Sequence, residues 1–252
     1  MGVILRYRDF LTTYKTRGHR IRHLEKYRYL FPIISSPALA GIVGDLIADG
    51  HLQGKPFWRI DFTSKNFDDL NSFQNRIKIL FNIESKIREC KTNLYSKSFN
   101  VGVNCAPIAR ILFKIGVPSG QKVLSSFRIP EWIKKDSDCF KEFCKHFFAC
   151  EGTIMHEKTR RFPQIRFEHW KSENLINEGE KFVKDICFGL EKYFGIKSSV
   201  RFPKCQGNRK DGVITKPIRV YILGESVLKF SKDVGFSNYK QQSLKAFLPD
   251  LN

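Results

Sequence analysis

Residues 38–50 read ALAGIVGDLIADG and form the most strongly patterned stretch of the chain. Ser36 and Pro37 suit the cap and first turn of a helix and Gly50 suits its end, so the pattern predicts a helix between them. The stretch is apolar on nearly every face apart from Asp45 and Asp49, which predicts burial on several sides and places Asp45 toward solvent or at a cap. Small residues spaced three and four apart form a stripe that a second backbone can approach closely: Gly41, Gly44 and Ala48.

A second stretch, residues 145–152, reads KHFFACEG and closes a helix predicted over 138–152. Asp49-Gly50 in the first stretch is equivalent to Glu151-Gly152 in the second. Each pair places a carboxylate on the last turn of a buried apolar helix. A carboxylate there is unfavourable against the negative end of the helix dipole, and more so if a second one faces it. A divalent cation resolves both conflicts. The two acids, backbone carbonyls and substrate phosphates then make the hard-oxygen site that Mg2+ prefers.

The elements around these two stretches follow the same order twice, which indicates an internal duplication. Hydrophobic periodicity predicts helix, strand pair, helix, strand pair and helix in each half. The first half has a strand over 57–64, a helix over 66–81, strands near 85–90 and 99–104, and a helix over 107–115. The second has its first strand over 164–169, a helix over about 173–194, strands near 199–202 and 218–223, and a helix around 226–234.

Both stretches resemble the two signature motifs of the LAGLIDADG homing endonucleases, in the monomeric two-repeat form. Residues 128–143, RIPEWIKKDSDCFKEF, are similar to the linker that this family shows before its second motif. The resemblance covers residues 36–252 and implies an α+β fold. Two pseudo-symmetric αββαββα repeats would pack through the two motif helices, and their antiparallel sheets would form a DNA-binding saddle. The domains are then a basic arm (1–35), a first repeat (36–126), a linker (127–137) and a second repeat (138–252).

The resemblance also implies a catalytic site. Asp49 and Glu151 would bind Mg2+, or Mn2+ as a substitute, with the backbone carbonyls of Gly50 and Gly152. Lys122 and Lys240, near the two acids, would be catalytic residues that act on the scissile phosphates. Lys65 and Lys171 lie at strand ends, where the match is weaker, and would belong to the DNA-binding surface. His146 departs from the family, which usually has a small residue there, and the helical spacing suggests that it is satisfied locally.

The charge balance favours a nucleic-acid partner. The chain has 252 residues with 44 Lys and Arg against 25 Asp and Glu, a net charge of +19. Such an excess opposes compaction unless a polyanion is bound. A membrane surface is a weaker alternative, because the basic residues are spread along the whole chain. No apolar run has the length of a membrane helix, and the first ten residues do not read as a secretory signal. We therefore expect an intracellular protein of the cytoplasm, nucleoid or an organelle.

The cysteines and the basic N-terminal residues indicate no catalytic chemistry of their own. The seven cysteines include no CxxC pair, so we expect reduced thiols and no zinc site. Residues 1–30 hold eight Lys or Arg and two acids, and they form either a helix on the main body or a flexible tail. Since they lie outside the repeats, we expect them to add affinity for DNA without selecting its sequence.

Strand alternation predicts which side chains meet DNA. Apolar residues such as Trp58, Ile60, Phe62, Ile165, Phe167, Val200, Phe202, Val220 and Ile222 point toward the helices. The opposite faces would contact base edges and phosphates in the major groove, unless they are ordinary solvated strand faces. They carry Arg59, Asp61, Thr63, Gln164, Arg166, Glu168, Arg201, Arg219 and Tyr221.

The leading interpretation is a site-specific, Mg2+-dependent endonuclease that cuts both strands of DNA and leaves short 3′ overhangs. It would be encoded in an intron, an intein or a free-standing mobile element. A DNA-binding regulator or an RNA-binding intron maturase of the same fold is the alternative. The presence of both Asp49 and Glu151 favours the enzyme, because a degenerate member would have lost one or both. An unrelated basic α/β binding protein does not explain the paired motifs.

Overall fold

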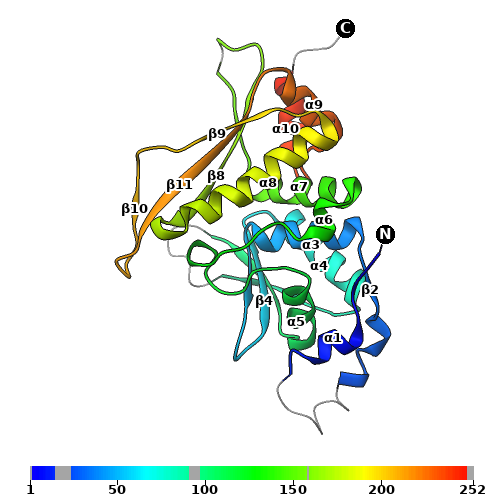
Figure 1. Ribbon diagram of the computed structural model, residues 1–252. Helices are drawn as coiled ribbons and strands as arrows, with labels where there is room; N and C mark the ends of the chain where they lie inside the picture. Colours follow the sequence, from blue (N-terminus) through cyan, green and yellow to red (C-terminus); the bar gives the residue numbers. More distant parts are fainter. Residues whose placement is uncertain (1, 15–23, 91–96, 158, 249–252) are drawn as a thin grey trace. The chain divides into compact units, whose positions relative to one another are not determined.

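The computed structural model describes residues 2–14, 24–90, 97–157 and 159–248. The chain divides into two compact units, unit 1 from Met1–Gly120 and unit 2 from Gln121–Asn252 (Figure 1). The predicted linker, residues 127–137, belongs to unit 2, because Phe127, Ile129 and Ile133 are buried in its core. Within it only a short stretch is extended, and helix α6 begins at Glu131 (Glu131–Lys134).

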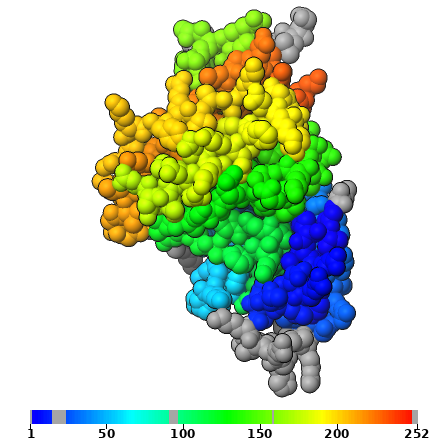
Figure 2. Space-filling view, viewed as in Figure 1, coloured from blue at the N-terminus to red at the C-terminus, as the bar shows by residue number. Residues whose placement is uncertain are grey.

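The described part of the N-terminal arm packs on unit 1. It forms strand β1 (Val3–Leu5), helix α1 (Tyr7–Leu11) and strand β2 (Ile33–Ile34), which pairs with β1. Phe10 is fully buried and contacts the ring of Phe31 at 5.0 Å between centroids. In Figure 2 the dark blue arm lies beside the green of helix α5 (Ala106–Lys114). Residues 15–23, which hold half of the arm's basic residues, lie outside the described part.

Unit 1 begins its repeat with the predicted apolar helix, α3 (Pro37–Ile47). The hydroxyl of Ser36 caps it by accepting from the amide of Leu39 at 3.3 Å. Strands β3 (Gly50–Gln53), β4 (Arg59–Ser64), β5 (Lys86–Glu89) and β6 (Phe99–Val103) follow, with helix α4 (Phe67–Phe81) between the pairs. They form one antiparallel sheet in the order β3-β4-β6-β5. The predicted helix, strand pair, helix, strand pair and helix are therefore present.

The helix-facing side of this sheet forms the core of unit 1. Ile60 and Phe62 alternate inward as predicted, and the ring of Phe62 stacks on that of Phe73 in α4 at 4.7 Å. Trp58 is buried but precedes the strand, and its φ of 47° is a turn conformation rather than an extended one. Strand β4 therefore begins at Arg59, two residues later than the start predicted at residue 57.

Asp45 is buried, which contradicts the prediction that it lies toward solvent. Its carboxylate is an ion-pair partner of the Arg76 guanidinium in α4, and the side chains are only 4% and 17% exposed. A carboxylate inside an apolar helix layer needs such a partner, because an unpaired buried charge is costly. The partner lies 31 residues away in sequence, so the spacing within α3 could not reveal it.

Replacing Arg76 by Met is expected to lower the free energy of unfolding of unit 1 by about 3–5 kcal/mol, because the Asp45 carboxylate is left buried without its cation. Urea unfolding measures this change. Lys78→Met is the control, because the Lys78–Glu84 pair is exposed and such pairs contribute about 0–1 kcal/mol. Adding Asp45→Asn to Arg76→Met should recover much of the loss. Equal stability of Arg76→Met and the wild type would contradict this role.

Unit 2 repeats the order with additions. Helix α7 (Ser137–Glu151), capped by Asp136, is followed by strands β7 (Thr153–Met155) and β8 (Gln164–Ser172) and by helix α8 (Ile176–Phe194). Strands β9 (Ser198–Arg201), β10 (Gly207–Asn208) and β11 (Ile214–Ile222) and helices α9 (Glu225–Asp233) and α10 (Lys240–Phe247) complete it. The antiparallel sheet has the order β10-β11-β8-β7, and β9 also pairs with β11. Both units are thus mixed α+β with antiparallel sheets.

Aromatic rings fill the core of unit 2. Phe147 and Phe148 of α7 both meet Phe167 of β8 edge to face, with centroids 5.2 Å apart in each pair. Ile165, Val220 and Ile222 are buried as predicted, whereas Phe202 is 51% exposed because β9 ends at Arg201. The seven cysteines are all free thiols. None of the helices in the described part of the chain has the length and apolar character to cross a membrane.

Candidate nucleic-acid interface and metal site

A tight glycine turn follows each of the two candidate acids. A Cβ on Gly50 would lie 2.7 Å from Leu46 Cα, and a Cβ on Gly152 would lie 2.5 Å from the carbonyl oxygen of Phe148. Real Cβ atoms do not approach backbone atoms so closely, so only glycine allows the chain to fold back over the last turn of each helix. The two units therefore share one local structure: a buried helix, an acid, a glycine and the first strand of a sheet.

The two acids differ slightly in their relation to the helices. Glu151 is the last residue of α7, as predicted, and is partly exposed. Asp49 follows the end of α3 by two residues and is exposed, because Ala48 leaves the helical conformation with a ψ of −104°. Both carboxylates thus stand at the surface end of an apolar helix.

Lys240 lies at the helix end that carries Glu151. Its Nζ donates to the carbonyl oxygens of Ala149 at 2.7 Å, Cys150 at 3.3 Å and Gly152 at 2.7 Å. The last carbonyls of a helix have no partner within it and carry the negative end of the dipole, so an ammonium is favourable there. The structure therefore brings Lys240 and the Glu151-Gly152 turn together.

This arrangement affects the expected metal ligands. The Gly152 carbonyl oxygen accepts from an ammonium, which makes it a poor ligand for a second cation. The Glu151 carboxylate is the better candidate. In the described residues no three His, Cys, Asp or Glu side chains gather into one cluster. Mg2+ does not need such a cluster, because it commonly keeps several waters and binds one or two carboxylates with substrate phosphates. The hard-oxygen donors at the two turns fit this ion.

Lys171 does not lie on the predicted DNA-binding surface. It is fully buried on the helix-facing side of β8, and its Nζ donates to the carbonyl oxygens of Lys122 at 2.5 Å and Ser125 at 2.6 Å. Lys122 itself is partly exposed and begins the short 3₁₀ helix η2 (Lys122–Leu124) of unit 2. Lys65, at the corresponding strand end of unit 1, is exposed.

His169 neighbours Lys171 on the same buried side of β8. Burial, and then the charges of Lys171 and Lys122, lower the pKa of His169 to about 3. Its Nε2 has no hydrogen-bond partner in the described structure, and its ring packs on Phe182 at 4.8 Å. The imidazole is therefore neutral in the folded protein at all ordinary pH values.

The buried imidazole predicts a specific acid sensitivity. Unfolding exposes His169, whose pKa returns to about 6.5, so the unfolded chain binds the proton that the folded one refuses. Stability attributable to His169 is complete above this pH and is lost as the pH falls toward 3. We expect the wild type to lose about 2 kcal/mol between pH 7 and pH 5 relative to His169→Phe. Parallel pH profiles of the two proteins in urea unfolding would contradict this.

His146 is satisfied locally, as predicted. It is buried in α7, and its Nε2 lies 3.6 Å from the Glu142 carboxylate one turn earlier. The hydrogen bond with His146, and then Lys145, lower the pKa of Glu142 to about 2. The pair explains a bulky histidine in an otherwise apolar helix without assigning it to a metal.

The solvent side of the unit 1 sheet is polar across all four strands. The register aligns His51, Asp61, Gly102 and Lys86 in one row, and Thr63, Asn100 and Arg88 in the next. Arg59 donates through Nε and Nη2 to Oδ1 of Asp61 at 2.9 and 2.6 Å, which links two predicted contact residues. The DNA contacts predicted from the sequence did not include the residues of β3, β5 and β6 on this face. Alternation in KIRE, residues 86–89, would have found Lys86 and Arg88.

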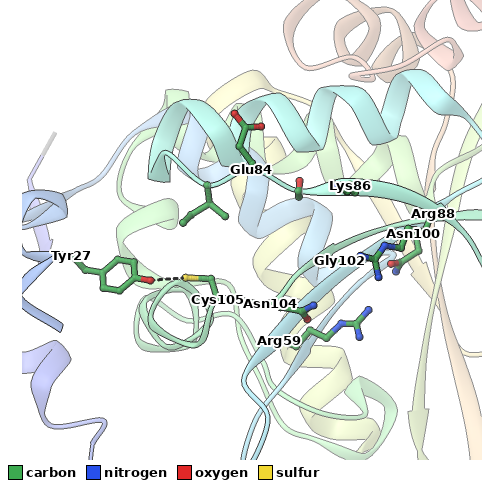
Figure 3. A pocket seen from close by; sticks show the side chains of 11 residues that line it. Tyr27, Arg59, Glu84, Lys86, Arg88, Asn100, Gly102, Asn104 and Cys105 are labelled. Carbon is green, nitrogen blue, oxygen red and sulfur yellow. Dashed lines mark hydrogen bonds between the residues drawn. The ribbon is translucent and has the colours of Figure 1, made fainter. Parts of the chain in front are cut away.

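Part of this face forms a cavity of about 390 Å³ (Figure 3). Cationic and amide side chains line it together with Tyr27 of the arm, whose hydroxyl lies 3.5 Å from Cys105 Sγ. The cations are Arg59, Lys86 and Arg88, the amides are Asn100 and Asn104, and Glu84 is the acid. Such a lining matches the phosphates and base edges of nucleic acid, because it offers positive charge beside paired donors and acceptors.

The corresponding face of unit 2 carries a network of charges. Arg219 Nε donates to Glu168 Oε1 at 2.7 Å, and Arg166 lies 3.8 Å from the same carboxylate. Across β9, Arg201 pairs in register with Arg219, and its guanidinium lies 5.1 Å from the centre of the Tyr221 ring. These predicted contact residues share one face. Gln164 does not belong to it: it is buried at the start of β8, where its amide faces Arg160.

No protein-family model matches the chain. The chain is 27% identical over 233 residues to a tRNA-splicing ligase of Methanopyrus kandleri, which covers 86% of the chain and 23% of the ligase. A glutamine–fructose-6-phosphate aminotransferase and a replication factor C small subunit, both of Methanocaldococcus jannaschii, match at 24% and 25% identity over 18% and 10% of their lengths. The chain thus spans less than a quarter of these relatives.

Solved structures place the fold. The homing endonuclease I-WcaI bound to its DNA recognition sequence matches 94% of this chain and 92% of its own, with a TM-score of 0.53 and 12% identity. The match to I-DmoI in complex with DNA and calcium covers 83% of this chain and 97% of the I-DmoI chain, with a TM-score of 0.50 and 17% identity. The match to the N-terminal LAGLIDADG domain of WhiA covers 98% of this chain and 100% of that domain, with a TM-score of 0.51 and 14% identity. The chain therefore has the α+β fold of the LAGLIDADG homing endonucleases.

Proposed function

We propose that this protein is a site-specific endonuclease that hydrolyses one phosphodiester in each strand of double-stranded DNA with a divalent metal. The observation that carries the proposal is the repeated turn in which an acid and a sterically required glycine end a buried helix, Asp49-Gly50 in one unit and Glu151-Gly152 in the other. Two equivalent acids are what a reaction on two equivalent strands requires. A single structural carboxylate would not need to be repeated.

The residues have distinct roles in this proposal. Asp49 and Glu151 would hold Mg2+, or Mn2+ in its place, and the ion would supply activated water and stabilise the leaving oxygen. Lys240 and Lys122 would place positive charge near the scissile phosphates. The polar sheet faces would bind the duplex, with Lys65, Arg59, Arg166 and Arg219 among the residues that contact it.

The sequence relatives support a mobile element rather than their own activities. Their names describe a ligase, an aminotransferase and a replication factor, and the shared segment covers at most 23% of those three proteins. A segment common to proteins with such different names is not expected to perform any of their reactions. A portable endonuclease, carried in an intron, an intein or on its own, accounts for this distribution.

A DNA-binding protein without nuclease activity is the second candidate. It is favoured by one observation: the Lys240 ammonium already binds the carbonyl oxygens of Ala149 and Gly152 at the Glu151 turn. In that case both sheets would bind DNA and neither acid would act. The following experiment separates the two candidates.

The test is selection from a pool of randomised duplex DNA, with the full chain in Mg2+ and in Ca2+. The proposal predicts that one sequence is enriched by binding in Ca2+ and that the same sequence is cut in Mg2+, with no cutting in EDTA. Binding of a defined site without cutting in Mg2+ or Mn2+ would establish the second candidate. Absence of both binding and cutting would overturn both. A linear fall of log affinity with log salt should accompany binding, because phosphate contacts release counterions.

A further inference from the structure

The buried ammonium of Lys171 is the one charged group of β8 on the helix-facing side of the unit 2 sheet. Its Nζ donates to the carbonyl oxygens of Lys122 and Ser125 at 2.5 and 2.6 Å. It also lies 4.0 Å from the centre of the Phe127 ring, which attracts a cation. All three partners belong to residues 122–127, the segment that opens unit 2.

The surroundings are built for a lysine at this position. The stem of Lys171 crosses α8 at Gly179, where a Cβ would lie 2.6 Å from Lys171 Cγ, so glycine is needed there. In the described part of the chain no carboxylate forms an ion pair with Lys171, although a buried charge without a counter-ion is costly. Burial and the charge of Lys122 lower the pKa of Lys171 to about 8, which still leaves it mostly protonated at pH 7.

Other contacts hold the flanks of this segment and close the turn locally, where the Ser125 amide donates to the carbonyl oxygen of Lys122 at 3.5 Å. Ser126 donates to Glu178 Oε2 at 3.1 Å, and Arg128 pairs with Asp185 at 2.6 Å. Gln121 accepts from Arg209 at 2.6 Å. The first and last carbonyls of the turn itself, those of Lys122 and Ser125, are held together by Lys171. Loss of this ammonium would remove both of these hydrogen bonds from β8 to the turn.

We propose that Lys171 is a positioning residue that fixes the 122–125 turn and thereby directs the side chain of Lys122 to the DNA phosphate. The inference rests on the proposed function, which gives Lys122 a role in cleavage. It assigns Lys171 no contact with DNA, because the side chain is fully buried. Lys171 would act through Lys122 alone, so the effects of substituting the two lysines on the cleavage rate should not add.

The test is a double-mutant cycle of Lys171→Met and Lys122→Met on the selected target. Single-turnover cleavage is measured in Mg2+ and DNA affinity in Ca2+. Lys122→Met is expected to slow cleavage by about 10²-fold. Lys171→Met should slow it by about 10-fold or more with DNA affinity unchanged, and the double variant should cleave at the rate of Lys122→Met. Lys184→Met, an exposed lysine of α8 that pairs with Glu180, is the control and should cleave as the wild type does.

Independent effects of Lys171→Met and Lys122→Met on the rate would overturn the proposal, as would full activity of Lys171→Met. Gly179→Ala is a second variant that keeps the charge but displaces the lysine stem, and it should show the same coupling to Lys122. Hydrogen exchange of the amides at 122–127, measured without DNA, should be faster in both variants by a larger factor than exchange of the β8 and β11 amides. This readout separates failure of the positioning role from failure of the proposed function. If no DNA is cut, unchanged exchange still refutes positioning.

Discussion

Asp49→Asn or Glu151→Gln is expected to abolish double-strand cleavage while folding and DNA binding remain intact. Each change preserves the shape of the side chain and removes the negative charge that a hard cation needs. The loss of rate should be at least as large as the ~10²- to 10³-fold that follows removal of one group stabilising a transition state. Asp49 is exposed and Glu151 partly exposed, so neither amide would be placed in the core.

Cleavage of the selected target in Mg2+ measures this effect, and affinity in Ca2+ verifies binding. Asp68→Asn and Glu157→Gln are matched controls, because both carboxylates are exposed and lie outside the two turns. They should cut at the wild-type rate. Cutting of duplex DNA by both Asp49→Asn and Glu151→Gln at that rate would show that the acids are not the metal ligands.

Lys240→Met should reduce cleavage by about 10²- to 10³-fold, because it removes the ammonium beside the Glu151 turn. It should also lower the stability of unit 2 by about 1 kcal/mol, since the last carbonyls of α7 lose a favourable cation. The two effects are distinguished by Lys240→Arg. Arginine restores a positive charge at the helix end and should restore stability more completely than rate.

Urea unfolding and single-turnover cleavage of the Lys240 variants provide the two measurements. Lys245→Met is the control, because this lysine is exposed on the same helix and does not contact the turn. A Lys240→Met protein that is destabilised but cuts at the wild-type rate once folded would make Lys240 a helix cap only.

Local patterns predicted the frame of both units. The Ser36 cap and Pro37 start α3 as expected, because these residue types satisfy the free amides and the fixed φ of a first turn. Alternation placed Ile60, Phe62, Ile165 and Phe167 inward, since one face of each sheet is covered by helices. The acid–glycine turns were also visible, because a glycine directly after an apolar helix marks its end.

Two errors, at Asp45 and Lys171, involve a partner distant in sequence. Asp45 is buried because Arg76 meets it, and no residue near Asp45 in α3 indicates this. Lys171 was assigned to the DNA surface by resemblance, whereas alternation from Ile165 and Phe167 places it on the buried side. Alternation was the better guide here. A lysine was expected to avoid that side, and its carbonyl partners lie 46 and 49 residues away.

The measurement that tests the central claim most directly is mapping of both strand ends of the selected target after incubation with the wild type in Mg2+. The account predicts one cut in each strand, offset by a few nucleotides with short 3′ overhangs, and no cuts when Asp49→Asn and Glu151→Gln are combined. A defined site that is bound but left uncut, or cuts that persist in the combined variant or in EDTA, would contradict it.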